Sequence, residues 1–472
     1  MPLQKQFSFP LSPYLMCRIV SFYIIISAAL LWRTQATAAI YQVGPSRAYT
    51  VPSAVAGLVN NGDTIEIDAA TYTGDVTSWY DDDLYIKGVG NGYARLDANG
   101  NHAEGKAIWV IKGHRCIIEN IEFLNCIVPD HNGAGIRQEG RGVHIKHCYF
   151  HHNEMGILAG NNTNSNIHIA HSEFAFNGYG DGYSHNVYIN HIDTFTFVYN
   201  YSHDPIVGHA LKTRASYNRI MYNRISEENG NGSYTIDIPN GGETIVMGNL
   251  IEQGPNSQNS TIIEYGAEGI NNPIADFVVA NNTIVNDRTS GTFFFISANT
   301  TLFKLYNNLV LGPGNYINGT PIAIDSTGNK RMTNIANAHL ANAAAFDYHL
   351  LTTSPAIDAA VNAGTYASIS LNPQNKYIHP QTGAARLSVG TAPDVGAYEF
   401  VGDNCVFVPT IAGNAISCNN SVQTYTIADL FGSIYNWTVV GGTILSGQGT
   451  HQIVVQWNNP TIATVNVTQT VP

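Results

Sequence analysis

Gly208-His209-Ala210-Leu211-Lys212-Thr213-Arg214-Ala215 is the stretch that decides the fold, because the flanking sequence aligns with it as a series of stacked turns. Four segments align without gaps, and their middle residues are Tyr188, Lys212, Asp237 and Glu264. The segments are Asn186–Asn190, Ala210–Arg214, Thr235–Pro239 and Ile262–Gly266. The steps between the middle residues are 24, 25 and 27 residues, roughly one turn of a parallel β-helix. The four side chains are therefore predicted to lie in one column, about 4.8 Å apart.

The same alternating pattern recurs along much of the chain. Runs of period two, each with an Asn or His near its end, are Cys116–Phe123, Val143–Phe150, Ile167–Phe174, Phe195–Tyr201, Arg219–Ile225, Thr244–Ile251, Phe277–Val285 and Leu302–Val310. Period two is typical of strands. Asn at a turn tolerates the left-handed conformation and can hydrogen-bond its neighbour in the stack. We therefore predict an all-β coil whose core runs from about Ile108 to Leu311, with structural Asn residues at its turns.

Both ends of the coil need a cover, since an open end exposes its interior and an unpaired edge. Apolar residues at helical spacing in Val51–Val59 predict an N-terminal capping helix. After Leu311 the repeat fades. Asp358, Asp394 and Glu399 are expected to bond turn amides in a closing segment rather than to bind a metal.

Composition limits the possible functions. Charged residues make up 12% of the 472 residues, and the net charge is −12. Without a basic stripe there is no predicted affinity for nucleic acid. Between His203 and Arg224 four cations face a single acid, Asp204, so the local field is expected to be positive there.

The two ends of the chain predict export and a separate domain. Lys5 and Arg18, the apolar run 19–32 and the small residues 36–38 are typical of a signal peptide spanning 1–38, with cleavage near Ala38 or Ala39. Residues 39–400 are expected to form the coil with its caps, and 401–472 a small β-sandwich. Export permits a disulfide between Cys405 and Cys418; the alternative is that both are unpaired.

The predicted column places a particular set of side chains outward, because alternate residues of a strand enter the core. Val187, Ile189, Leu211, Thr213, Ile236 and Ile238 are the expected inward set. The outward set is Lys212, Arg214, Asp237, Glu264, Tyr188, Asn186 and Asn190, with His203, His209, Tyr234, Tyr265 and Glu268 nearby. The alternative is a solvated ladder in which Lys212 and Asp237 form a surface ion pair of less than about 1 kcal/mol.

Such a face limits the chemistry. Removal of the C5 proton of a uronic acid needs a cation beside the sugar carboxylate and a base. Lys212 is the predicted base if Arg214 and desolvation lower its pKa, whereas Asp237 acts in the opposite direction. His209 completes the predicted catalytic set of Lys212, Arg214 and Asp237. Alternatively, Asp237 and Glu264 share a calcium ion, with oxygen ligands from Asn190 or Glu268.

These motifs resemble known families. The coil looks like the right-handed parallel β-helix superfamily of pectate lyases, chondroitinase B, alginate lyases and mannuronan epimerases. The Lys212-x-Arg214 pair, with acids on the following turns, is similar to the lysine base, arginine and calcium-binding carboxylates of the chondroitinase B and alginate lyase family. His203-Asp204-Pro205 followed by His209 resembles elements of mannuronan epimerases, in a different order. Residues 401–472 resemble polycystic-kidney-disease-like (PKD-like) domains of exported proteins, which implies a spacer or display module. In this domain Trp437 and Trp457 are expected to be core residues.

Three function classes follow from the sequence. The first is a secreted or surface-exposed lyase or C5-epimerase acting on an acidic glycan, with Tyr188, Asn186, Asn190, His203, Tyr234 and Tyr265 binding substrate. The second is a glycoside hydrolase using Asp237 and Glu264, which needs carboxylates about 5–10 Å apart. The third is a non-catalytic adhesion protein. In each case a polysaccharide is the expected partner, and the protein is expected to be a monomer with no membrane insertion after signal cleavage.

Overall fold

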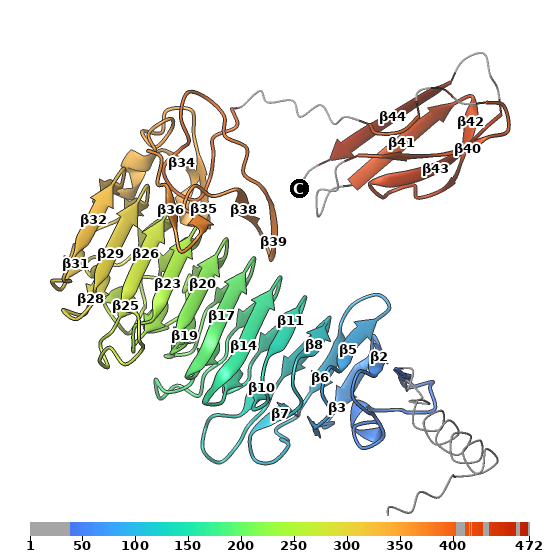
Figure 1. The fold of residues 1–472 in the computed structure, drawn as a ribbon, viewed down its shortest axis with the longest axis horizontal. Helices are drawn as coiled ribbons and strands as arrows, with labels where there is room; N and C mark the ends of the chain where they lie inside the picture. The colour runs from blue at the N-terminus through green and yellow to red at the C-terminus, as the bar shows by residue number, and fades with distance from the viewer. Residues whose placement is uncertain are drawn as a thin grey trace, which may run out of the picture. The chain divides into compact units, whose positions relative to one another are not determined.

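The computed structural model describes residues 38–402, 411–414, 416, 418–427, 434–458 and 463–470. Within these ranges the chain forms strands and three short 3₁₀ helices, with no α-helix. Most strands belong to three long parallel sheets that wind into a coil (Figure 1). Parallel crossovers are right-handed in nearly all proteins, so the sheets are consistent with the predicted right-handed β-helix.

Between Thr64 and Asn318 each turn of the coil contributes one strand to each of the three sheets, called A, B and C, in that order. Sheet A contains β1 (Ile40–Val43), β2 (Thr64–Asp68), β5 (Tyr85–Val89), β8 (Cys116–Glu119), β11 (Val143–Lys146), β14 (Asn162–Ala170), β17 (Ile192–Val198), β20 (Tyr217–Met221), β23 (Glu243–Met247), β26 (Asp276–Ala280), β29 (Leu302–Tyr306) and β32 (Ile324–Thr327). Sheet B contains β3 (Thr71–Thr73), β6 (Ala94–Asp97), β9 (Ile121–Leu124), β12 (Tyr149–His151), β15 (Glu173–Ala175), β18 (Tyr201–His203), β21 (Arg224–Ser226), β24 (Leu250–Gln253), β27 (Thr283–Asn286), β30 (Leu309–Leu311) and β33 (Lys330–Met332). Sheet C contains β4 (Thr77–Trp79), β7 (Ala107–Ile111), β10 (Ala134–Gln138), β13 (Met155–Ala159), β16 (Val187–Ile189), β19 (Leu211–Thr213), β22 (Ile236–Ile238), β25 (Thr261–Tyr265), β28 (Thr292–Ile296) and β31 (Asn315–Asn318). The coil thus extends beyond the predicted limits at both ends.

The turn from sheet A to sheet B is held by a ladder of buried Asn side chains. The backbone N–H of Asn200 donates to Oδ1 of Asn223 at 2.8 Å, and that of Asn223 to Oδ1 of Asn249 at 2.8 Å. The left-handed residue is the one before the ladder position, as at Tyr199 (φ 57°) and Tyr222 (φ 55°). In two later turns this left-handed residue is itself an Asn, Asn281 (φ 53°) or Asn307 (φ 54°). The predicted structural role of these Asn residues is confirmed.

Inside the coil, like side chains stack from turn to turn. The rings of Phe123, Phe150 and Phe174 are nearly parallel, with successive centroids 4.9 and 4.7 Å apart. These distances match the spacing of neighbouring strands. The inward face of each strand therefore forms a continuous apolar core.

The predicted N-terminal capping helix is wrong. The segment contains only a 3₁₀ helix, η1 (Pro52–Ala54), followed by turns. The nine-residue stretch contains Gly57 and several β-branched residues, so it is too short and too weak a helix former. Val55 and Val59 are nevertheless buried against the core, so the apolar spacing reflects contact with the coil.

The segment after the coil runs back along its outer surface instead of only closing its far end. Asn307 donates to Val361 O at 2.7 Å, and Asn281 to Leu371 O. Farther back, His171 hydrogen-bonds Gln381 O at 3.1 Å. Figure 1 shows the strands of this segment beside the coil. The segment contains η2 (Ile335–Ala338), β34 (Leu340–Asn342), η3 (Ala343–Ala345), β35 (Asp347–Leu350), β36 (Thr365–Tyr366), β37 (Ile369–Ser370), β38 (Asn375–Ile378) and β39 (Thr382–Ala385).

Apolar residues on the outside of the middle turns explain this path. Leu250, Val285 and Leu309 pack against the segment in one cluster, and Met247 and Val278 in another. Strands buried on both faces are apolar throughout instead of alternating. The segment thus buries apolar surface that the coil leaves uncovered.

The acids of this segment do bond turn amides. Asp358 accepts from Thr391 N at 2.7 Å, and Asp394 accepts from Asp358 N at 2.8 Å. Glu399 accepts from Asp394 N at 3.2 Å and pairs with Arg386 at 3.0 Å. These contacts confirm the structural role predicted for the three acids.

The C-terminal domain has two antiparallel sheets. They contain β40 (Val422–Thr426), β42 (Gly442–Ser446) and β43 (Gln452–Trp457) in one, and β41 (Ile434–Val440) and β44 (Thr464–Thr470) in the other. Trp437 and Trp457 are buried in its core, as predicted. Cys405 lies outside the described residues, as do residues 1–37 of the predicted signal peptide. No helix within the described ranges is long and apolar enough to cross a membrane.

Candidate functional site

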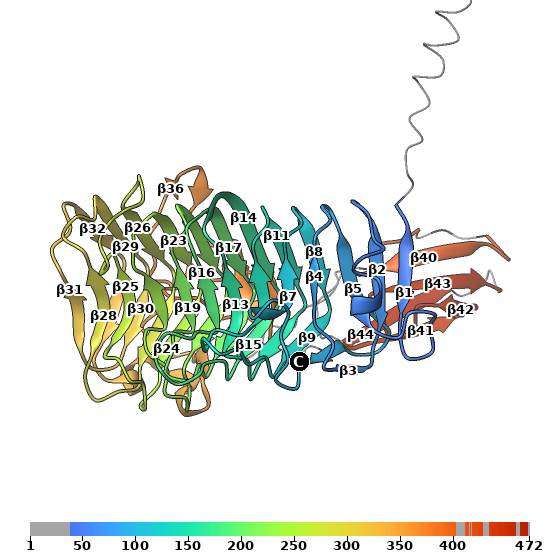
Figure 2. The same ribbon diagram turned by 90° about the horizontal axis from the view of Figure 1, so that it is seen from below.

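The strand register predicted from the sequence is confirmed. On sheet C, Tyr188 pairs with Lys212, Lys212 with Asp237, and Asp237 with Glu264. Figure 2 shows β16, β19, β25 and β28 of sheet C in a row. The column continues to Phe295 beyond Glu264. We call Tyr188, Lys212, Asp237 and Glu264 the outer column.

Lys212 is almost buried although it points away from the core. Its Nζ lies 2.7 Å from Oδ2 of Asp237 and 3.2 Å from Oε1 of Glu268. The side chain of Lys212 is 10% exposed and that of Asp237 is 3% exposed. Burial by itself lowers the pKa of Lys212, but the charge and hydrogen bond of Asp237 outweigh it and raise the pKa above the usual lysine value. Lys212 is therefore an ammonium group in the free protein at neutral pH.

Arg214 is held from three sides. Its Nε donates to the Tyr188 hydroxyl at 3.0 Å, and its NH2 lies 2.7 Å from Oε2 of Glu268. NH1 donates to Oδ1 of Asn240. The guanidinium plane is thus fixed beside Lys212, with Glu268 bridging the two cations.

Two histidines form a second, parallel stack three residues before the outer column. The rings of His185 and His209 lie 4.4 Å apart and nearly parallel. The backbone N–H of His209 donates to the ring Nδ1 of His185 at 3.0 Å, and the backbone N–H of Tyr234 donates to the ring Nδ1 of His209 at 3.2 Å. Gly208 permits this close stacking, since a Cβ there would lie 1.6 Å from Ser184 O.

The stack fixes the protonation of His209. Burial lowers the pKa of His209 to about 4, so its imidazole is neutral. Because Nδ1 accepts a hydrogen bond, the ring proton is on Nε2, which lies 3.3 Å from Oδ2 of Asp237. The protonated Nε2 of His209 therefore faces the Asp237 carboxylate, while Nδ1 accepts from Tyr234.

Asp237 and Glu264 form a proton-sharing pair. Burial raises the pKa of Glu264 to about 10, with further contributions from its hydrogen bond to Asp237 and from the Asp237 charge. For Asp237, burial raises the pKa, but His209, Glu264 and Lys212 together lower it below the usual value. No N–H or O–H group donates to the buried Oε2 of Glu264, and the raised pKa means that this carboxyl group carries a proton at neutral pH. Two adjacent carboxyl groups thus carry one negative charge between them.

The local positive field predicted from the sequence is wrong. Lys212 and Arg214 are balanced by Asp237 and Glu268. Likewise Arg219 pairs with Glu243, and Arg224 with Glu228 at 2.7 Å. Two of these four acids, Asp237 and Glu243, come from the next turn, about 25 residues away, and Glu268 comes from two turns away, so a count along a short window of sequence omits them.

Several residues predicted to bind substrate lie elsewhere. Asn186 is buried inside the coil, where it donates to His203 O at 2.8 Å. Tyr265 points inward, next to outward Glu264, and stacks on Phe277. Both predictions are wrong, because Tyr265 follows the alternation of its strand and Asn186 lies just before β16, where the turn still faces inward.

The remaining predicted residues are only partly in the site. His203 lies on sheet B, between Asp204 at 2.8 Å and Glu173 at 3.3 Å, away from the outer column. Asn190 accepts from the N–H of His191 at 2.8 Å and serves its own turn. Tyr234 is half-buried against His209, with ring centroids 5.0 Å apart. Only Tyr234 of these three borders the column.

Sequence reasoning missed Asn240 and Asn272. Asn240 receives the hydrogen bond from Arg214, and Asn272 donates to Ala215 O at 3.1 Å and to Gly241 O at 2.9 Å. Both lie in loops after sheet C strands, where neither period nor charge marks them.

The acids of the column do not form a ready calcium site. Within the described residues there is no group of three or more His, Cys, Asp or Glu side chains arranged to hold a metal ion. Lys212 already occupies Oδ2 of Asp237, and the Asp237–Glu264 contact holds a proton. Calcium binding would require both the ammonium group and the proton to leave, so we derive no reaction step through calcium.

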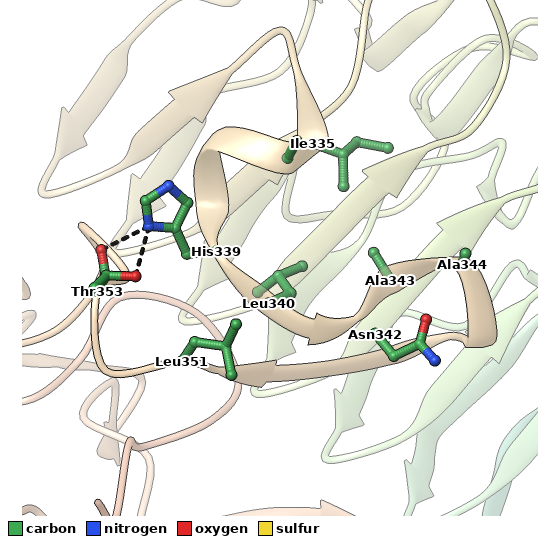
Figure 3. Close-up of a pocket in the computed structure, with 9 residues that line it drawn as sticks. Ile335, His339, Leu340, Asn342, Ala343, Ala344, Leu351 and Thr353 are labelled. Carbon is green, nitrogen blue, oxygen red and sulfur yellow. Dashed lines mark hydrogen bonds between the residues drawn. The ribbon is translucent and has the colours of Figure 1, made fainter.

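A separate cavity of about 570 Å³ lies in the segment after the coil (Figure 3). It is lined mainly by Ala and Leu side chains, with His339 bonded to Thr353 at its edge. None of its lining residues belongs to the outer column or its neighbours, so it plays no part in the candidate site.

Comparison with known proteins identifies the last domain. Residues 406–471 match the family model of the PKD-like domain, which confirms that prediction. One solved structure, described as the crystal structure of pectate lyase Pel9A, is similar to this chain with a TM-score of 0.45. The identity is 16%, over 77% of this chain and 97% of that one. No curated protein matches the chain in sequence. The assignment of a parallel β-helix rests on the three sheets themselves.

Proposed function

We propose that the protein is an exported, polysaccharide-active β-helix protein that acts on an acidic, uronate-containing glycan at the outer column of sheet C. The observation that carries the proposal is the pair Lys212 and Arg214, fixed side by side and almost buried on an outward face. Burying two long cations costs desolvation free energy, and a buried ion pair often stabilises a fold no more than apolar residues of the same size. Stability alone therefore does not explain why the two cations are there. Binding of a carboxylate by the two cations supplies that reason.

The proposed reaction is proton abstraction at C5, as in a lyase or a C5-epimerase. Arg214, with its planar fork of donors, is suited to binding the sugar carboxylate, and neutralising that carboxylate makes the C5 proton more acidic. Lys212 binds as an ammonium group; after that group has lost a proton to solvent, its neutral amine takes the C5 proton while Arg214 holds the carboxylate. In elimination the C4–O bond then breaks, a C4–C5 double bond forms, and the electron pair leaves with the oxygen. In epimerisation the carbanion instead receives a proton on the opposite face.

Lys212 can act as a base only in its neutral amine form. Asp237 raises the pKa of Lys212, so the neutral amine is a minor form at neutral pH. The proposed enzyme is therefore most active in alkaline solution. His209 and Asp237 position Lys212, and neither needs to touch the substrate.

Hydrolysis is the second candidate, favoured by one observation. The environments of Asp237 and Glu264 push their pKa values apart, which is the usual pattern of an acid and base pair. The two carboxyl groups, however, hydrogen-bond directly, whereas glycosidases separate them by about 5–10 Å. Hydrolysis would need this pair to open. A third possibility, glycan binding without catalysis, predicts affinity without product.

The test is a screen of the purified protein against acidic and neutral polysaccharides. A new ultraviolet absorbance from the unsaturated product identifies a lyase, reducing ends without that absorbance identify a hydrolase, and exchange of the C5 proton for solvent deuterium identifies an epimerase. Lys212→Ala should abolish the lyase or epimerase reaction. Lys304→Ala is the control, because Lys304 also pairs with a carboxylate, Asp325, at 3.2 Å but lies on sheet A. Full turnover by Lys212→Ala would rule out Lys212 as the base.

Calcium remains a proposed partner of Asp237, Glu264 and Glu268. If calcium binds there, adding it raises the denaturation midpoint of the wild-type protein and not that of Asp237→Asn. An unchanged midpoint and unchanged activity after chelation would exclude it.

A further inference from the structure

The carboxylate of Glu268 lies across both cations of the site. Oε1 is 3.2 Å from Nζ of Lys212, and Oε2 is 2.7 Å from NH2 of Arg214. The two residues are 56 and 54 positions away in sequence. Glu268 therefore reaches back over the turn that carries Asp237 to contact the turn before it.

Glu268 differs from its partners in exposure. Its side chain is 48% exposed, whereas those of Lys212 and Arg214 are 10% and 14% exposed. Asp237, which also pairs with Lys212, is 3% exposed. Of the two acids that balance the cations, Glu268 is thus the one that solvent, or a ligand arriving from solvent, can reach.

The loop that carries Glu268 is fixed independently of this contact. The N–H of Glu268 donates to Pro239 O at 3.0 Å, and that of Asn271 to Asn240 O at 3.1 Å. Asn272 ties the loop to Ala215 O and Gly241 O. Gly266 has a φ of +85° at its start, where the chain turns back over the preceding strand. Because the backbone is held by its own bonds, the side chain of Glu268 can rotate away without moving the loop.

We propose that Glu268 occupies the position of the substrate carboxylate and must be displaced by it, so that this residue sets the selectivity of the site for carboxylate-bearing sugars. The inference rests on the proposed function, since it assigns Lys212 and Arg214 to the same carboxylate. One carboxylate replaces another, so the charge balance of the two cations is kept through binding. A neutral sugar displaces Glu268 only by leaving Arg214 without a carboxylate and Lys212 with Asp237 alone, which is costly for groups so little exposed.

Removing the charge of Glu268 tests the proposal. Glu268→Gln has the same shape but no charge, so it no longer competes with a substrate carboxylate for Lys212 and Arg214. Because a substrate carboxylate would no longer have to displace the two partly exposed ion pairs of Glu268, binding should tighten by about three- to tenfold, which corresponds to about 0.7–1.4 kcal/mol. Asp325→Asn is the matched control, since Asp325 is 46% exposed and pairs with Lys304 at 3.2 Å.

Binding is measured by affinity electrophoresis in gels containing polygalacturonate, alginate or hyaluronate, with fully methyl-esterified polygalacturonate as the uncharged probe. Glu268→Gln should bind at least one acidic polymer about three- to tenfold more tightly than wild type, with no gain for the ester. Adding Arg214→Gln to this variant should remove the gain. Glu268→Asp, whose carboxylate is one methylene shorter, should gain less and guards against a folding defect of Glu268→Gln.

Three results would overturn the proposal: no gain with any of the acidic polymers, an equal gain with the ester, or the same gain in Asp325→Asn. Failure of the proposed function gives a different pattern. If Glu268→Gln gains carboxylate affinity but neither protein yields product, the site binds uronates without the proposed reaction. If wild type yields unsaturated product and Glu268→Gln gains nothing, only the role of Glu268 is refuted.

Discussion

Replacing Lys212 by Met tests whether the column is a buried, mutually dependent network. The variant keeps the length of the aliphatic chain but removes the ammonium group, leaving the Asp237 carboxylate, 3% exposed, without its closest cation. Breaking one partner of a buried pair costs about 3–5 kcal/mol. Asp237 retains His209 at 3.3 Å and the proton shared with Glu264, which limit the loss. We therefore expect a decrease of about 3 kcal/mol in the free energy of unfolding.

The assay is urea denaturation followed by circular dichroism at neutral pH. Adding Asp237→Asn to Lys212→Met removes the unpaired charge and should recover at least half of the lost stability. Lys304→Met, whose partner Asp325 is 46% exposed, should lose no more than about 0.5 kcal/mol. The reasoning is refuted if Lys212→Met behaves like Lys304→Met, or if the double variant is less stable than the single one.

Three further predictions concern protons and turns. The folded-state pKa of Glu264 is about 10, far above the usual value of 4.5. The unfolded chain therefore releases this proton first, and the stability of the fold falls as pH rises from about 5 to about 10. Glu264→Gln should exceed wild type in urea midpoint near pH 8 and match it near pH 4, and an equal advantage at both pH values would contradict a shared proton. If Lys212 is the base, its raised pKa makes kcat/KM on the confirmed uronan rise with pH between about 7 and 10, whereas a flat profile assigns the base elsewhere. Asn223→Ala removes the acceptor for Asn200 N at 2.8 Å and the donor to Phe197 O at 2.8 Å, so thermal or urea unfolding should show a loss of about 2–4 kcal/mol, and a loss below about 1 kcal/mol would indicate that the ladder is redundant.

Periodicity in the sequence was sufficient for the coil and for the register of its site. The segments centred on Tyr188, Lys212, Asp237 and Glu264 align at intervals that differ by only a few residues, and the strands pair as the alignment requires. A one-residue slip would have turned Lys212 into the core. The alternation of β25 also implied that Tyr265 points inward, so that error lay in the use of the pattern and not in the sequence.

Other features could not be found by local reasoning. Val51–Val59 has the apolar spacing of a helix, but its burial comes from packing on the first turns. The path of the segment after the coil depends on which outward residues of distant turns are apolar, such as Leu250 and Leu309. Neither fact is contained in the segment itself.

The sequence by itself determined that this chain forms stacked turns and that a lysine, an arginine and two acids share one outward face, because a repeat of about 25 residues brings corresponding positions of neighbouring turns together. Only the tertiary structure decided the protonation states of the residues on that face. Lys212 is an ammonium group, His209 is neutral, and Asp237 and Glu264 share a proton. These states depend on burial and on distances of about 3 Å to groups one or two turns away, including Glu268 from a loop two turns further along. Such distances follow from side-chain packing, which a one-dimensional pattern does not specify.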